Sequence, residues 1–144
     1  MAVVGVGNVL LKDEGLGVHV ANLLKELKLP EDVEVYDYGV DGLRILDLTD
    51  SYEKVIIIDA VQRGGKPGTI YRFRVNEIDP RNVPFNMTSL HEMDLITVLE
   101  IGRAIGKKLD NVVVLGVEAK EVKGEFGLSP EINNAIPDLM RLIH

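Results

Sequence analysis

Two carboxylates and one imidazole, Glu14, Asp59 and His91, form the set of side chains in this chain that could hold a divalent transition-metal ion. Two hard oxygen ligands and a neutral imidazole suit such an ion and leave coordination positions open for water or substrate. The three residues lie in separate segments and form no H-E-x-x-H motif. They can therefore meet only through the fold, and the sequence around each of them must show how.

The hydrophobic pattern predicts a layered α/β domain, in which strand-length apolar runs alternate with stretches of helical period. Strands are expected at 2–6, 33–38, 54–59, 69–75 and 111–117. Three of them are nearly continuous Val, Ile and Leu, as in strands that are buried on both faces at the centre of a parallel sheet. The fourth alternates apolar with polar residues, which predicts a half-exposed edge strand of antiparallel direction.

Helices are expected to fill the gaps and to cover both faces of this sheet. The apolar periodicity predicts helices over 14–28 and 41–50, a third beginning at Ser89, and a last one from Pro130 to the end. Ser89-Leu90-His91-Glu92 fits a capping box, which places His91 near the positive end of its helix. That position favours the neutral imidazole, which is the form that binds metal. The expected architecture is a single domain over 1–144, a three-layer α/β/α sandwich with a mostly parallel five-stranded sheet.

Polar side chains follow four of the expected strands: Asn8, Asp37, Asp59 and Glu118. In an open parallel sheet, ligands bind in the crevice beyond the carboxyl ends of the strands, so these side chains are expected to converge there. A loop after Asn8 leads to a further pair of carboxylates, which are expected in or near the first turn of the first helix.

Structural roles remain open for the same residues. Asp13 and Glu14 could complement the dipole of the helix that they begin, and Asp59 could cap the loop that follows its strand. Glu118 could pair with Lys120 or accept a hydrogen bond from a backbone amide. His91 could equally be an ordinary surface histidine.

Composition excludes several other classes of protein. The 144 residues include 16 Lys and Arg against 23 Asp and Glu, a net charge of −7, and the dispersed basic residues argue against a nucleic-acid partner. Cysteine is absent, so disulfides, thiolate metal sites and a cysteine nucleophile are excluded. The longest apolar runs are too short to span a bilayer, and the first residues do not resemble a signal peptide.

Three common catalytic or binding motifs are also absent. Gly5-Val6-Gly7 follows a strand, yet Leu10 stands at the third glycine position of the dinucleotide fingerprint, and no P-loop motif occurs. None of the three serines lies in G-x-S-x-G, and Ser89 is better explained as a helix cap.

The sequence resembles the hydrogenase maturation endopeptidases, and the resemblance runs through most of the chain. The family's motifs appear in order as Gly5-Val6-Gly7-Asn8, Asp13-Glu14-Gly15-Leu16-Gly17, Asp59-Ala60-Val61 with Gly64 and Pro67-Gly68-Thr69, Ser89-Leu90-His91, and Gly127-Leu128-Ser129. Two departures exist: Asp37-Tyr38-Gly39-Val40 lacks the family's threonine, and Val117-Glu118-Ala119 lacks its more usual proline.

The resemblance implies a protease that removes the C-terminal extension of a nickel–iron hydrogenase large-subunit precursor. The family's metal-contacting positions carry over onto Glu14, Asp59 and His91. Nickel would be supplied by the substrate, zinc or cadmium could substitute for it, and bound nickel would signal that maturation is complete. Asp59 and Asp37 are the expected catalytic residues, and the expected role of Asn8 and Asp13, two of the motif residues, is to position the loop. A cytoplasmic monomer is expected, with the precursor as partner and no nucleic acid or membrane insertion.

Three alternatives remain at this stage. A nucleotide- or metal-binding module would use the same crevice without cleaving anything. A self-sufficient metallopeptidase would hold its own metal and act on short peptides. A related endopeptidase could serve a different class of hydrogenase, including one that reduces another cofactor.

Overall fold

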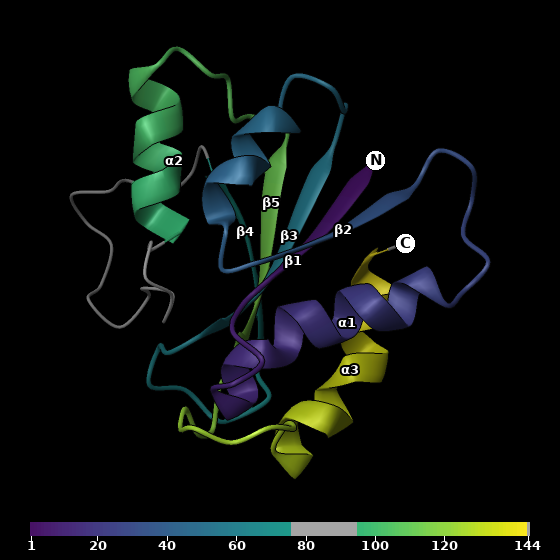
Figure 1. Cartoon of the computed structure of the whole chain (residues 1–144), viewed down its shortest axis with the longest axis vertical. Helices are drawn as coiled ribbons and strands as arrows, with labels where there is room; N and C mark the ends of the chain where they lie inside the picture. Colours follow the sequence, from purple (N-terminus) through teal and green to yellow (C-terminus); the bar gives the residue numbers. More distant parts are fainter. Residues whose placement is uncertain (76–94, 144) are drawn as a thin grey trace.

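The computed structural model describes residues 1–75 and 95–143, and in this part of the chain a five-stranded sheet lies between helices (Figure 1). The strands are β1 (Ala2–Val6), β2 (Glu34–Gly39), β3 (Val55–Val61), β4 (Ile70–Arg74) and β5 (Val112–Glu118). Their order in the sheet is β2-β1-β3-β5-β4. All neighbours are parallel except β4, which runs antiparallel to β5 at the edge. The predicted mostly parallel sheet with an antiparallel edge strand is confirmed.

The helical segments differ in detail from the prediction. A 3-10 turn, η1 (Lys12–Gly15), precedes α1 (Leu16–Lys25), and the segment expected as a short helix over 41–50 is a second 3-10 turn, η2 (Gly42–Asp47). The remaining helices are α2 (Leu95–Ala104) and α3 (Pro130–Ile143). The predicted helix start at Ser89 lies outside the described residues. Within the described ranges, no helix has the length and apolar character needed to cross a membrane.

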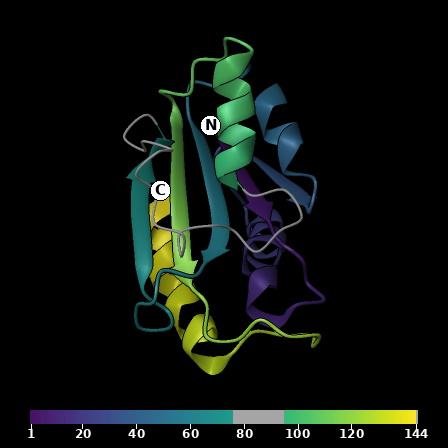
Figure 2. The ribbon, with the colours of Figure 1, turned by 90° about the vertical axis from the view of Figure 1, so that its left-hand side faces the viewer.

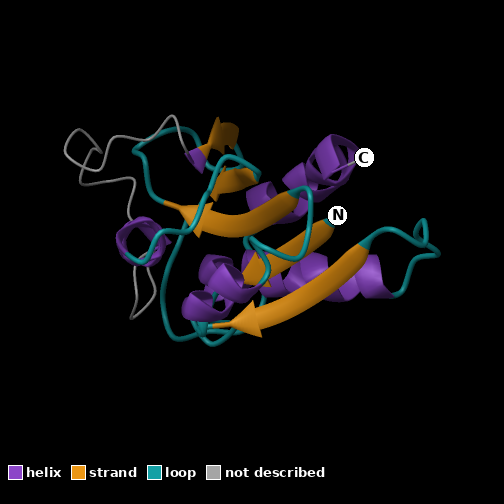
Figure 3. Cartoon of the chain, turned by 90° about the horizontal axis from the view of Figure 1, so that it is seen from above, coloured by secondary structure: helices purple, strands orange, loops and turns teal. Residues whose placement is uncertain are grey.

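Helices cover both faces of the sheet, which gives the predicted three layers (Figures 2 and 3). On one face, Val4 and Ile57 pack in a cluster with residues of η2 and α2. On the other face, Val3 and Ile56 pack with residues of α1 and α3. Successive residues of a strand thus enter opposite clusters, as the pleat of a strand buried on both faces requires.

Two glycines let the start of α1 lie directly on the backbone of the sheet. A Cβ on Gly17 would stand 2.3 Å from the carbonyl oxygens of both Val6 and Ile58, and a Cβ on Gly5 would stand 2.0 Å from the carbonyl oxygen of Gly17. No side chain fits at either position, because the neighbouring atoms are backbone. The first turn of α1 is therefore held against the carboxyl ends of β1 and β3.

We expect Gly17→Ala to lower the free energy of unfolding by about 2–3 kcal/mol, because its Cβ overlaps two backbone oxygens that cannot move independently. Gly124→Ala is the matched control, since a Cβ there has no heavy atom within 4 Å, and its effect should stay within about 0.5 kcal/mol. Urea unfolding of the three proteins measures the difference. Equal stability of the two variants would contradict the close packing of α1 on the sheet.

Candidate functional site

Glu14 and Asp59 are two carboxylates that the fold buries completely at the carboxyl edge of the sheet. Glu14 lies in η1 and Asp59 in β3, and each is 0% exposed. Elements η1 and β3 contact each other directly. The same close approach of Gly17 to the carbonyl of Ile58, the residue before Asp59, brings the turn that carries Glu14 onto the end of β3.

Burial changes the acid–base behaviour of Glu14. Removal from water disfavours the charged carboxylate and raises the pKa of Glu14 to about 7, from an ordinary value of 4.5. The side chain can therefore exchange a proton near neutral pH, and a cation placed beside it would favour its ionised form.

The third member of the predicted metal-binding set, His91, lies outside the described residues. Among residues 1–75 and 95–143, no group of three His, Cys, Asp or Glu side chains could hold a metal ion. The structure thus describes two of the three predicted ligands, both buried, and the complete set of Glu14, Asp59 and His91 stays a prediction. A buried pair of carboxylate oxygens fits a divalent cation chemically, because a cation offsets both the burial and the mutual repulsion of the two charges.

Asp13 ties the beginning of α1 to the loop after β5. Its Oδ2 accepts hydrogen bonds from the backbone N–H groups of Lys120 at 2.9 Å and Glu121 at 2.8 Å. Ser129 donates to it twice, from its backbone N–H to Oδ1 at 2.7 Å and from its Oγ to Oδ2 at 2.8 Å. Asp13 is 1% exposed, so this carboxylate is buried and fully engaged. Its contacts fit the predicted role of positioning a loop.

Glu118, at the end of β5, also anchors a loop. The sequence left two partners open for it, Lys120 or a backbone amide. It does not pair with Lys120, whose Nζ instead lies 3.1 Å from Glu131. Its carboxylate accepts hydrogen bonds from the backbone N–H of Arg63, at 3.1 and 3.0 Å, and from that of Gly65 at 2.9 Å. The hydroxyl of Tyr71 donates a further bond at 3.0 Å. Glu118 therefore fixes the loop that follows Asp59, the backbone-amide role considered above.

Asp37 and Asn8 both bond to their own local backbone. Oδ1 of Asp37 accepts a hydrogen bond from the N–H of Gly39 at 3.1 Å, and Oδ1 of Asn8 accepts one from the N–H of Leu10 at 2.9 Å. Asp37 pairs in register with Gly5 of β1, while the opposite side of Gly5 pairs with Ile58 of β3. The residue of β3 in register with Asp37 is therefore Ile58 and not Asp59, and since successive side chains of a strand point to opposite faces, the register does not bring Asp37 and Asp59 onto the same face.

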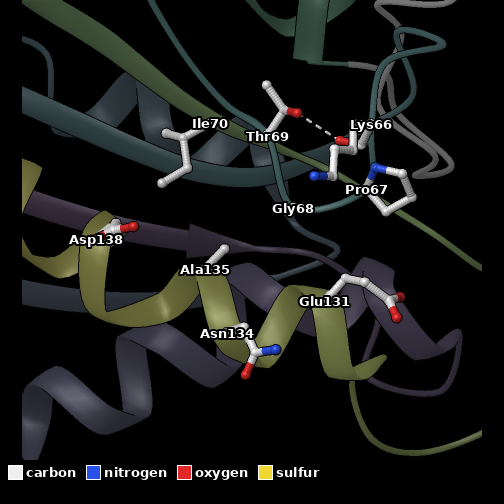
Figure 4. A pocket seen from close by; sticks show the side chains of 9 residues that line it. All are labelled: Lys66, Pro67, Gly68, Thr69, Ile70, Glu131, Asn134, Ala135 and Asp138. Carbon is white, nitrogen blue, oxygen red and sulfur yellow. Dashed lines mark hydrogen bonds between the residues drawn. The ribbon is translucent and has the colours of Figure 1, made fainter.

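A surface groove of about 300 Å³ lies between α3 and the loop before β4 (Figure 4). Its polar lining residues come from both sides: Lys66, Thr69, Glu131, Asn134 and Asp138. None of the residues predicted for the site lines this groove. The candidate site is therefore the buried carboxylate pair at the carboxyl edge and not this groove.

The raised pKa of Glu14 predicts a pH-dependent stability of the metal-free protein. The folded state keeps a proton on Glu14 at pH values where the unfolded chain releases it. The stability that this proton gives the folded state is therefore fully present below pH 4.5 and is lost as the pH rises to about 7. Between pH 4.5 and pH 8, the free energy of unfolding of wild type should fall by about 2–3 kcal/mol more than that of Glu14→Gln, whose side chain cannot ionise. Urea unfolding with a chelator present measures this, and parallel pH profiles of the two proteins would contradict the burial of an ionisable Glu14.

Comparison with known proteins identifies the family. A profile of the hydrogenase maturation proteases matches residues 18–144. The chain is 33% identical to coenzyme F420 hydrogenase subunit delta of Methanothermobacter thermautotrophicus, over 98% of this chain and 90% of that protein. It is 32% identical to hydrogenase 2 maturation protease of Escherichia coli, over 93% of this chain and 82% of that protein.

Solved structures agree with this assignment. The hydrogenase maturating endopeptidase HybD of Escherichia coli superposes with a TM-score of 0.81 at 29% identity, over 99% of this chain and 88% of that one. A second structure, of an endopeptidase from Escherichia coli, gives a TM-score of 0.84 at 30% identity, over 99% and 88% of the two chains. This chain therefore belongs to the hydrogenase maturation protease family and is a hydrolase that cleaves peptide bonds.

Proposed function

We propose that this protein removes the C-terminal extension of a nickel-loaded hydrogenase large-subunit precursor, and that Glu14, Asp59 and His91 contact the nickel ion carried by that substrate. The observation that carries the proposal is the complete burial of Glu14 and Asp59, which lie in two elements, η1 and β3, that contact each other. Burial disfavours the charged form of a carboxylate, and a divalent cation placed beside it favours that form.

The ligand types of this chain also support a visiting nickel ion. The sequence has no cysteine, so it offers nickel only oxygen and nitrogen ligands. Thiolates bind soft and borderline metals more strongly, so a precursor that holds nickel through thiolates would keep the ion after cleavage. The bound nickel would then act as the signal that the precursor is ready for processing, and zinc or cadmium could take its place in binding experiments.

Peptide hydrolysis requires that the attacking water lose a proton and that the leaving amine gain one. Asp59 is our candidate for the carboxylate that accepts the proton, because it lies fully buried in the central strand β3. Asp37 is the candidate for a supporting role, and it lies in β2 on the other side of β1. A metal ion at the site would polarise the scissile carbonyl.

The relative named as a subunit of a coenzyme F420 hydrogenase makes a hydrogenase of that class a candidate source of the precursor. A self-sufficient metallopeptidase is the alternative, and it differs in two observable ways. It would be purified with metal bound, and it would cleave short peptides without a hydrogenase precursor.

Metal binding should stabilise the fold, because the ion binds only the folded arrangement of carboxylates. At a concentration about ten times Kd, nickel, zinc or cadmium should raise the Tm of wild type by roughly 3–6 °C. Asp59→Ala and Asp59→Asn should both abolish the shift, whereas Asp110→Ala, an exposed aspartate before β5, should keep it. Thermal unfolding measures the Tm shift. A full shift in both Asp59 variants would show that Asp59 does not bind the ion.

Cleavage itself should depend on nickel in the substrate. We expect wild type to release a short C-terminal peptide from nickel-loaded precursor and to leave nickel-free precursor intact, because the ion completes the site. His91→Ala should reduce the rate at least about 100-fold, the scale on which catalytic groups act. Mass spectrometry of the precursor measures both results. Equal cleavage with and without nickel, or an unchanged rate in His91→Ala, would contradict the proposed mechanism.

A further inference from the structure

Large apolar side chains that remain exposed are distributed unevenly over the described surface. In residues 1–75 and 95–143, five of them lie in segments that follow the carboxyl ends of strands: Val9, Leu10, Val40, Leu43 and Phe126. The other three, Leu27, Ile105 and Leu142, lie at or just beyond the C-terminal ends of helices, at the opposite edge of the sheet. Exposed apolar side chains gathered on one face indicate an interaction surface.

Two segments, residues 9–12 and 121–126, form a continuous platform at this edge, which we call the docking ledge. They lie side by side in Figures 1 and 2 and are joined by a parallel bridge between Leu11 and Glu125. The backbone N–H of Lys12 donates a hydrogen bond to the carbonyl of Glu125 at 2.7 Å. Two segments more than 100 residues apart in sequence thus present one surface.

The docking ledge is fixed to the turn that carries Glu14. A Cβ on Gly15 would stand 2.9 Å from the Cα of Val9, so the first residue of the ledge packs on the residue after Glu14. At the other side, Asp13 accepts the hydrogen bond from the backbone N–H of Glu121. The ledge and the buried carboxylates therefore belong to one rigid arrangement, with no linker between them.

The charges of the docking ledge neutralise one another. Nζ of Lys12 lies 2.8 Å from Glu121 and 3.7 Å from Glu125, and Nζ of Lys123 lies 3.4 and 3.2 Å from the same two carboxylates. Two positive and two negative side chains give the ledge no net charge on a chain of net charge −7. The same two segments carry Leu10 and Phe126, which are 54% and 73% exposed. Protein–protein interfaces combine exposed apolar side chains with polar side chains of this kind.

We propose that the docking ledge binds the folded body of the hydrogenase precursor, with Leu10 and Phe126 as its apolar anchors, a step that rests on the proposed function for the identity of the partner. Because the ledge is continuous with the turn of Glu14, a protein that presents its scissile bond to the buried carboxylates must cover it. Binding through the ledge does not involve the nickel ion. The ledge therefore recognises the precursor with or without nickel, whereas bound nickel determines when the precursor is cleaved.

The test measures binding of purified nickel-free precursor to wild type and to single serine variants. Leu10→Ser and Phe126→Ser should each weaken binding about tenfold, as expected when an apolar anchor is lost. Leu27→Ser and Ile105→Ser change equally exposed side chains at the opposite edge and should bind as wild type does. All four variants should keep the metal-induced Tm shift, which shows that the fold and the carboxylate site are intact.

A second readout separates this proposal from the proposed function. On nickel-loaded precursor, the Leu10 and Phe126 variants should show a roughly tenfold higher KM with an unchanged kcat, because docking and not chemistry is weakened. Cleavage of nickel-free precursor would contradict the proposed function, and the affinities of the Leu10 and Phe126 variants for the precursor would still test the docking ledge. Wild-type affinity in both ledge variants, equal losses in the control variants, or no binding of the precursor by wild type would each overturn the docking ledge.

Discussion

The contact between the first turn of α1 and the bare backbone of the sheet is the constraint on which the site depends. Gly17 has backbone oxygens of β1 and β3 where a Cβ would be, and Gly5 approaches Gly17 in the same way. This packing holds η1 against the end of β3, so that Glu14 and Asp59 are both buried at the carboxyl edge. A larger residue at either glycine would push the helix away from the sheet and open the site to water.

Two further buried carboxylates hold the loops around this site. Asp13 binds the loop after β5 through four hydrogen bonds, and Glu118 binds the loop after β3 through the N–H groups of Arg63 and Gly65 and through Tyr71. Several hydrogen-bond donors stabilise a buried carboxylate. The acidic residues at the carboxyl edge thus include two loop anchors, Asp13 and Glu118, beside the candidate metal-binding pair, and burial raises the pKa of Glu14 to about 7.

The strands and their mostly parallel arrangement were predictable, because continuous Val/Ile/Leu runs carry that information locally. The location of the site at the carboxyl edge stays a prediction from the polar residues near the strand ends. The 3-10 geometry of Gly42–Asp47 was not predictable, since a short apolar period does not distinguish it from an α-helix. The hydrogen-bond partners of Asp13 and Glu118 also could not be predicted from the local sequence pattern. Ser129 and Arg63 lie 116 and 55 residues away from them, so only the fold brings each pair together.

The central claim is that Glu14, Asp59 and His91 converge on one metal ion. Anomalous X-ray diffraction from crystals soaked with zinc tests it most directly, because the ion marks its own position. The account predicts one strong peak about 2.0–2.2 Å from carboxylate oxygens of Glu14 and Asp59 and from a ring nitrogen of His91. A zinc ion bound at other residues, with Glu14 and Asp59 still buried and not in contact with metal, would contradict it.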